Sequence, residues 1–270
     1  MKGRLAVLLA VALLAAPARA MDLPPDPLRS VMWEWMARQY LSDGRPIVFD
    51  PAVKVLAPAR AEDPMSVPVS IDATGVPGAS RILVFADLNP VTHILTYEPL
   101  DSAAWIAFRF KIEQATPVRA AVIGSDGAWH VGGTIVDAAG GGCTAPAQGR
   151  ADTSWVDHLG DVQARIWSEP GSEARLRMRI RHPMDTGLAP GIPAFYVEAL
   201  DVKAPDGRSL GRLELHQPVS ENPTMTLRPR LPAGAGSLSI EGRDTEGTPI
   251  RATVPAPARS GALPLPDRAG

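Results

Sequence analysis

Residues 175–181 read Arg-Leu-Arg-Met-Arg-Ile-Arg, a strict alternation of basic and apolar side chains. Successive side chains of a β-strand point to opposite faces of the sheet, so the apolar residues share one face and the arginines the other. The stretch therefore predicts a strand with one buried and one solvated face, which is typical of an antiparallel sheet.

Similar short stretches lie on both sides of this strand and are expected to be strands as well. In the second half of the chain they cover residues 162–167, 174–180, 194–203, 209–216, 224–228, 237–242 and 250–254. In the first half they cover residues 67–71, 81–85, 92–97, 104–112, 117–123 and 129–136. Turns rich in proline and glycine separate them, among them Pro205-Asp206-Gly207. This spacing predicts a mainly β protein with two β-sandwiches.

One helix is expected before the first strand, at residues 27–41. It would begin at Asp26-Pro27-Leu28, where proline suits the first helical turn, and end near Gly44-Arg45-Pro46. Its Trp33 and Trp35 are interpreted as packing residues, because aromatic side chains at helical spacing are usually buried.

The domain organisation follows from these elements and the segments between them. We expect a signal peptide at residues 1–20, a first domain at 26–137, a glycine-rich arm and linker at 138–160, and a second domain at 161–254. The tail at 255–270 is rich in Pro, Ala and Gly and is expected to be disordered. The two domains are expected to pack closely, with Trp105, Trp167 or Phe195 as candidates for the buried contact.

The first twenty residues have the three parts of a secretory signal. Lys2 and Arg4 precede an apolar core at 5–16, and Ala18-Arg19-Ala20 matches the cleavage pattern. Twelve apolar residues are too few to cross a membrane, which needs roughly 20, and no later stretch is long and apolar enough for insertion. The sequence therefore predicts export to the periplasm.

Charge argues against nucleic acids and anionic membranes as partners. Cleavage after Ala20 would leave 24 basic and 29 acidic residues, a formal net charge of −5. The two signs are interspersed along the chain, and no charge run marks a binding tail.

Cys143 is the only cysteine, and it follows Gly140, Gly141 and Gly142. An unpaired cysteine in an exported protein is buried and inert, pairs with another chain, or is reactive. Glycines allow a mobile backbone, and three extended residues reach roughly 10 Å. We therefore expect residues 138–146 to be a solvent-exposed arm, with a thiol pKa near its ordinary value of about 8.5. The alternative is an ordinary flexible linker with an incidental cysteine.

Other patterns that carry chemistry are weak. His93, His130, His158, His182 and His216 show no spacing typical of a metal site, and no cofactor or metal is expected. There is no nucleophile elbow, phosphate loop or dinucleotide fingerprint. The sequence favours a protein that serves enzymes over an enzyme.

Three ordered motifs in the second domain resemble SoxZ, a subunit of the periplasmic SoxYZ sulfur carrier. They are residues 181–187 (Arg-His-Pro-Met-Asp-Thr-Gly), 192–197 (Ile-Pro-Ala-Phe-Tyr-Val) and 218–223 (Pro-Val-Ser-Glu-Asn-Pro), within a matched span of about 161–254. The first domain resembles SoxY in its helix, its strands at 82–136 and the Gly141-Gly142-Cys143 that follows them. The chain is most similar to fused SoxYZ-like carriers associated with quinoprotein dehydrogenases.

This resemblance implies immunoglobulin-like sandwiches and a covalent attachment site at Cys143, flanked by the glycines of the arm. The SoxZ-like domain would brace the carrier domain. Its segment His182, Pro183, Met184, Asp185, Thr186 and Gly187 is either a docking loop or only a turn set by its proline and glycine. The implied partners are periplasmic redox enzymes, either Sox-type cytochromes or a quinoprotein dehydrogenase. Separately from the resemblance, the unpaired cysteine leaves open a disulfide-linked dimer through Cys143.

The first functional hypothesis is therefore a non-enzymatic carrier of sulfur species, or of another thiol-bound intermediate, in sulfur metabolism such as thiosulfate oxidation. The second is a docking or assembly module for a quinoprotein dehydrogenase, with Cys143 secondary. The third is a copper-binding β-sandwich that uses Met and His ligands.

Overall fold

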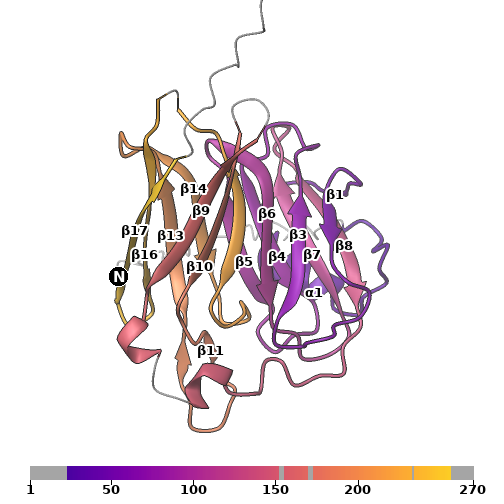
Figure 1. The fold of residues 1–270 in the computed structure, drawn as a ribbon. Coiled ribbons are helices and arrows are strands. Elements are labelled where there is room, and N and C mark those ends of the chain that lie inside the picture. Colours follow the sequence, from indigo (N-terminus) through magenta and orange to yellow (C-terminus); the bar gives the residue numbers. More distant parts are fainter. Residues whose placement is uncertain (1–22, 152–154, 170–172, 233, 257–270) are drawn as a thin grey trace, which may run out of the picture.

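The computed structural model describes residues 23–151, 155–169, 173–232 and 234–256. Two β-sheets face each other and enclose one apolar core (Figure 1). The nine-stranded sheet has the order β1 (Ile47–Phe49), β8 (Trp129–Val136), β7 (Thr116–Ile123), β4 (Arg81–Ala86), β5 (His93–Glu98), β14 (Ser209–Leu215), β13 (Val197–Lys203), β16 (Ser237–Asp244) and β17 (Pro249–Pro255). The six-stranded sheet has the order β2 (Lys54–Leu56), β3 (Val67–Asp72), β6 (Ser102–Phe110), β15 (Thr224–Pro229), β10 (Ala174–Ile180) and β9 (Val162–Ser168).

The mainly β fold class is confirmed, and every stretch expected to be a strand contains one. In β10 the alternating residues Leu176, Met178 and Ile180 are fully buried while the arginines between them are exposed. The short strands β1, β2 and β11 (Asp185–Thr186) were not expected. Strand β12 (Ala194–Phe195), which pairs with β11, lies within the expected stretch 194–203. Strands of two or three residues carry too little alternation to be recognised from sequence.

Both sheets run without interruption from one half of the chain into the other. Strand β5 pairs with β14, and β6 pairs with β15, so two antiparallel ladders join the halves. The close packing that was expected is therefore made by strand edges, which satisfy backbone hydrogen bonds, and by a shared core. Phe195 is buried as expected, whereas Trp105 and Trp167 lie half-buried on the outer face of the six-stranded sheet.

Helix α1 spans Trp33–Tyr40, shorter than the expected 27–41. The chain before it forms turns because the Asp26 carboxylate accepts hydrogen bonds from the backbone N–H groups of Leu28 and Ser30, which holds this segment outside a helix. Trp33 is buried against the outer face of the nine-stranded sheet, as expected. Trp35 is 50% exposed, so its assignment as a packing residue is wrong.

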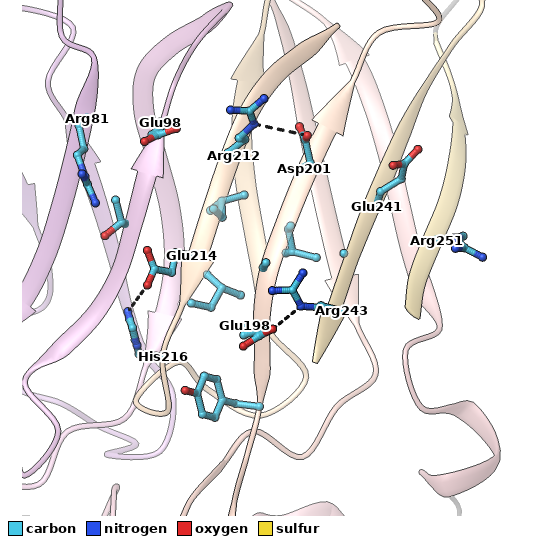
Figure 2. A pocket seen from close by; sticks show the side chains of 17 residues that line it. Arg81, Glu98, Glu198, Asp201, Arg212, Glu214, His216, Glu241, Arg243 and Arg251 are labelled. Atoms are coloured by element: carbon cyan, nitrogen blue, oxygen red, sulfur yellow. Dashed lines mark hydrogen bonds and ion pairs between the residues drawn. The ribbon is translucent and has the colours of Figure 1, made fainter. Parts of the chain in front are cut away.

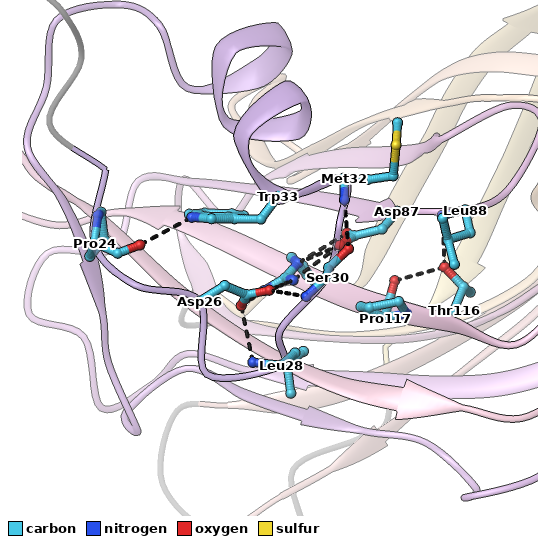
Figure 3. A network of polar contacts seen from close by, with 11 residues as sticks. Pro24, Asp26, Leu28, Ser30, Met32, Trp33, Asp87, Leu88, Thr116 and Pro117 are labelled. Carbon is cyan, nitrogen blue, oxygen red and sulfur yellow. Dashed lines mark hydrogen bonds and ion pairs between the residues drawn. The ribbon is translucent and has the colours of Figure 1, made fainter.

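A buried ion network fixes this N-terminal segment to the sheet. Arg119, on β7, donates hydrogen bonds to the carboxylates of both Asp26 and Asp87 at 2.7–3.1 Å. The Arg119 and Asp87 side chains are fully buried, and Figure 3 shows how Asp26 and Asp87 converge from different segments. The arginine also lies over the Trp33 ring, 4.8 Å from its centroid.

Two histidines stack across the junction between the halves. His93 begins β5 and His216 follows β14, with their ring centroids 3.9 Å apart. Burial, together with the neighbouring His216 and Arg81, lowers the pKa of His93 to about 3. Burial also lowers the pKa of His216.

We expect these histidines to make the protein sensitive to acid. Below pH 6.5 these histidines bind protons in the unfolded chain but stay neutral in the folded chain. The free energy of unfolding therefore falls as the pH drops towards 3. At pH 4.5 His93 alone should cost on the order of 2 kcal/mol relative to pH 7. Urea unfolding of the wild type and His93→Phe at both pH values measures this. An unchanged acid dependence in the variant would contradict the prediction.

The predicted signal peptide lies outside the described residues, as do residues 257–270 of the predicted tail. Pro255, where that tail was expected to begin, ends β17. No helix within the described part of the chain is long and apolar enough to cross a membrane.

Candidate functional site

The cysteine segment, residues 137–144, follows the end of β8 at Val136 and turns back against the end of β6. Gly140 and Gly141 have φ values of 102° and 87°, a backbone conformation that non-glycine residues rarely adopt. Gly142 then donates a hydrogen bond from its N–H to the Ile112 carbonyl at 3.1 Å. A Cβ atom at position 142 would lie 2.1 Å from the Pro64 carbonyl oxygen, so only glycine fits here. The glycines therefore allow a tight approach to the sandwich.

The Cys143 side chain is fully buried, which corrects the expectation of an exposed arm. Its Sγ donates a hydrogen bond to the Lys111 carbonyl at 3.5 Å. The expectation was wrong because the same glycines that allow mobility also allow close packing of the backbone.

The Glu113 carboxylate holds the cysteine segment in place. It accepts hydrogen bonds from the backbone N–H groups of Gly141, Cys143 and Thr144 at 3.2, 2.9 and 3.1 Å. The Thr144 hydroxyl donates to the same carboxylate at 3.1 Å. Converging N–H groups of this kind form a nest that suits an anion.

The second half of the chain covers the other side of the cysteine. The Thr186 hydroxyl donates to the Cys143 carbonyl at 2.6 Å, and the buried Lys111 ammonium donates to the Met184 carbonyl at 2.5 Å. Of the six residues suggested as a docking loop, His182, Pro183, Met184, Asp185 and Thr186 are buried and only Gly187 is exposed. As folded, this segment forms a buried wall against Lys111 and Cys143 through Met184 and Thr186, and it is not an exposed docking loop.

The buried surroundings of the Cys143 side chain, the cysteine pocket, keep its thiol protonated. Burial, reinforced by the charge of Glu113, raises the pKa of Cys143 to about 12, while Lys111 acts in the opposite direction. The expectation of an ordinary thiol pKa is therefore wrong. Burial in turn lowers the pKa of Lys111, against the attraction of Asp185, Cys143 and Glu221. A thiol in this state is a poor nucleophile, since the thiolate is the reactive form.

Two further polar pairs lie near the covering segment. The partly exposed Arg150 pairs with the buried Asp185 at 2.6 Å, and the buried His182 lies 3.6 Å from Asp244. Burial lowers the pKa of His182. No group of three or more His, Cys, Asp or Glu side chains that could hold a metal ion occurs among the described residues.

Sequence reasoning missed Lys111, Glu113 and Arg150. Each is an ordinary charged residue in sequence, and the first two lie about thirty positions before the cysteine. The one available signal for Lys111 and Glu113 was their place at the end of the predicted strand 104–112: Lys111 is its last residue but one, and Glu113 directly follows it.

Comparison with known proteins gives two adjoining family matches. Residues 37–143 match SoxY, described as "Sulfur oxidation protein SoxY", and residues 162–255 match SoxZ, described as "Sulphur oxidation protein SoxZ". The SoxY match ends at Cys143. No curated protein sequence matches the chain.

Several solved structures are similar to parts of the chain. The sulfur carrier protein SoxY from Chlorobium limicola f thiosulfatophilum shows 20% identity and a TM-score of 0.34, covering 39% of this chain and 93% of its own. Fibronectin(III)-like modules of CbhA from Clostridium thermocellum show 13% identity and a TM-score of 0.25, covering 76% of this chain and 92% of their own. A β-glycosidase from Bacteroides vulgatus shows 14% identity and a TM-score of 0.23, covering 82% of this chain and 26% of its own.

The two matches lie in one chain, in the order SoxY then SoxZ, and together they include the cysteine segment and most of the wall that covers it. The chain is therefore a fused SoxYZ-like protein, a member of the sulfur oxidation protein families SoxY and SoxZ.

Proposed function

We propose that this protein is a non-enzymatic covalent carrier in periplasmic sulfur oxidation, with Cys143 as the attachment site. The observation that carries the proposal is the position of the only thiol, which is the last residue of the SoxY match and is enclosed by the SoxZ half. The chain binds its cargo through sulfur, and partner redox enzymes perform the oxidation. Residues 1–20 would direct export and be removed.

The closed pocket defines the first step of loading. Cys143 must leave its contacts with Glu113 and Thr186 before a partner can reach it, because the side chain has no exposed surface. Gly140 and Gly141 provide the hinge, since both already occupy φ values that need glycine. Once released, the thiol loses the burial that raises its pKa and ionises more readily.

Exchange at the released thiol needs no outside oxidant. The Cys143 thiolate attacks a sulfur atom that a partner holds in a sulfur–sulfur bond. A new bond forms between Cys143 and that sulfur, and the old bond breaks. The partner's thiolate leaves with the electron pair and takes up a proton, which balances the one that Cys143 lost.

Intact-mass measurement on protein taken directly from its native periplasm tests the proposal. We expect a mass increase from sulfur-containing adducts, removed by a thiol reductant and absent from Cys143→Ser. The serine variant should fold normally, because no disulfide is lost, but should fail to restore growth that depends on this protein.

Burial of the thiol favours one alternative, a docking module for a quinoprotein dehydrogenase in which Cys143 is structural. That alternative predicts an unmodified Cys143 and full activity of the serine variant. Either result would overturn the carrier proposal.

A further inference from the structure

Charged residues are distributed differently on the two outer faces of the sandwich. On the nine-stranded sheet, basic and acidic residues alternate and pair. Arg212 lies 3.6 Å from Asp201, Lys203 lies 2.5 Å from Glu241, and Arg243 pairs with Glu198. Figure 2 shows this face with both signs distributed across it. Such a face is largely neutralised by its own residues.

The outer face of the six-stranded sheet carries charges of mainly one sign. We call it the basic sheet face. Its outward-pointing strand residues include seven basic side chains and one acidic side chain: Lys54, Arg109, Arg165, Arg175, Arg177, Arg179 and Arg228, with Asp72. The whole chain has a formal net charge of −2, so this concentration is local.

Most of these cations lack an anionic partner within the described residues. Arg175 lies 3.5 Å from Glu169, and no other basic strand residue of the face has a carboxylate within 4 Å among the residues described. Arg177 lies directly opposite Arg165 in the β9–β10 ladder. Like charges directly opposite each other destabilise a sheet. The fold therefore tolerates a repulsion that an outside anion would relieve.

Two tryptophans give the basic sheet face its anchors. Trp105 lies under Arg228 at 4.4 Å, and Trp167 lies under Arg175 at 4.7 Å, measured from the guanidinium carbon to the ring centroid. Both rings line a shallow hollow of about 680 Å³. Half-buried tryptophan and arginine side chains are the residue types that dominate the binding energy of protein interfaces.

The basic sheet face also leads to the cysteine pocket. Strand β6 ends one residue before Lys111, and β10 ends two residues before His182, so Arg109 and Arg179 lie at the pocket end of the face. Six strands about 4.8 Å apart are roughly 24 Å wide, a size that suits the ~800 Å² that one partner contributes to a protein interface.

We propose that the basic sheet face docks an acidic surface of the enzyme that loads or unloads Cys143. This inference rests on the carrier function, which requires such an enzyme. A protein fits better than a membrane or a nucleic acid because the charge is confined to one face with aromatic anchors, while the remainder of the chain is acidic.

The test measures binding of a twenty-residue peptide rich in Asp and Glu to the full protein in 50 mM salt. Its Gln and Asn analogue, phosphatidylglycerol vesicles and a short DNA duplex serve as comparison probes. We expect salt-sensitive binding of the acidic peptide that is at least about tenfold weaker in the Arg165→Glu/Arg177→Glu double variant. The matched control is Arg81→Glu/Arg251→Glu, two exposed arginines on the nine-stranded side, which should change the affinity less than twofold.

Equal weakening in the control would show that only net charge matters, and this would overturn the proposal. Equal binding of the neutral peptide, or binding of vesicles or DNA but not of the acidic peptide, would overturn it as well. The measurement uses no thiol chemistry and can be repeated in Cys143→Ser. A failure of the carrier function would therefore leave this result intact, and the two outcomes remain distinguishable.

Discussion

Replacement of Glu113 by alanine should raise the reaction rate of Cys143 with iodoacetamide at pH 8 by two orders of magnitude or more. In the wild type, a pKa of about 12 keeps the Cys143 thiol protonated, and burial makes it inaccessible to the reagent. At pH 8 the thiolate fraction is then on the order of 10⁻⁴, against roughly a tenth for an exposed thiol. The variant loses the acceptor of four hydrogen bonds that close the segment, and it also loses the negative charge that opposes ionisation.

The pH profile adds a second readout. Because burial raises the folded pKa of Cys143 above its ordinary value, the folded protein keeps its proton where the unfolded chain loses it. The free energy of unfolding should therefore fall as the pH rises from 9 towards 12, and less so in Glu113→Ala.

Alkylation of Cys143 followed by intact-mass measurement gives the reaction rates. Gln114→Ala is the control, since that neighbouring side chain bonds to the Leu88 carbonyl and not to the cysteine segment. Equal rates in wild type and Glu113→Ala would contradict the proposed role of the carboxylate.

Replacement of Arg119 by methionine should lower the free energy of unfolding by about 3–5 kcal/mol. Methionine retains much of the volume but leaves two carboxylates, Asp26 and Asp87, in a buried site without a counter-charge. It also releases the N-terminal segment, because Asp26 connects that segment to β7. The midpoint and slope of urea unfolding give the change.

Arg38→Met is the matched control for this measurement. Arg38 forms an exposed pair with Glu34 one helical turn away, and such a pair contributes at most about 0.5 kcal/mol. A loss in Arg119→Met as small as in this control would show that the buried network adds no stability.

The strands could be predicted because their signal is local. In β10 each Leu, Met and Ile follows an Arg, and the period of two is legible without any knowledge of the partner strand. The helix start could not be predicted as well, because the Asp26 carboxylate bonds to the backbone of Leu28 and Ser30 instead of capping a helix there. The same carboxylate bonds to Arg119, 93 residues away, and propensity and capping signals do not include such a contact.

The candidate site was predicted in part for the same reason. The only cysteine and its family resemblance could be read from the sequence, but its burial depends on long-range contacts. Glu113 lies 30 residues before Cys143 and Thr186 lies 43 residues after it. A run of glycines is compatible with both a mobile arm and a tightly packed turn. The packed turn forms here because Gly142 lies against the carbonyls of Pro64 and Ile112, which leave no space for a side chain at that position.

The continuous sheets also affect how the chain is made. Strands β5 and β6 belong to the first half, and their partners β14 and β15 are synthesised more than a hundred residues later. Until then the growing chain presents two unpaired strand edges, the feature by which sheets associate wrongly with other chains. A separately produced first half would carry these edges permanently. Fusion in one chain supplies the missing strands at high local concentration and in equal number, so neither half ever waits for a partner molecule.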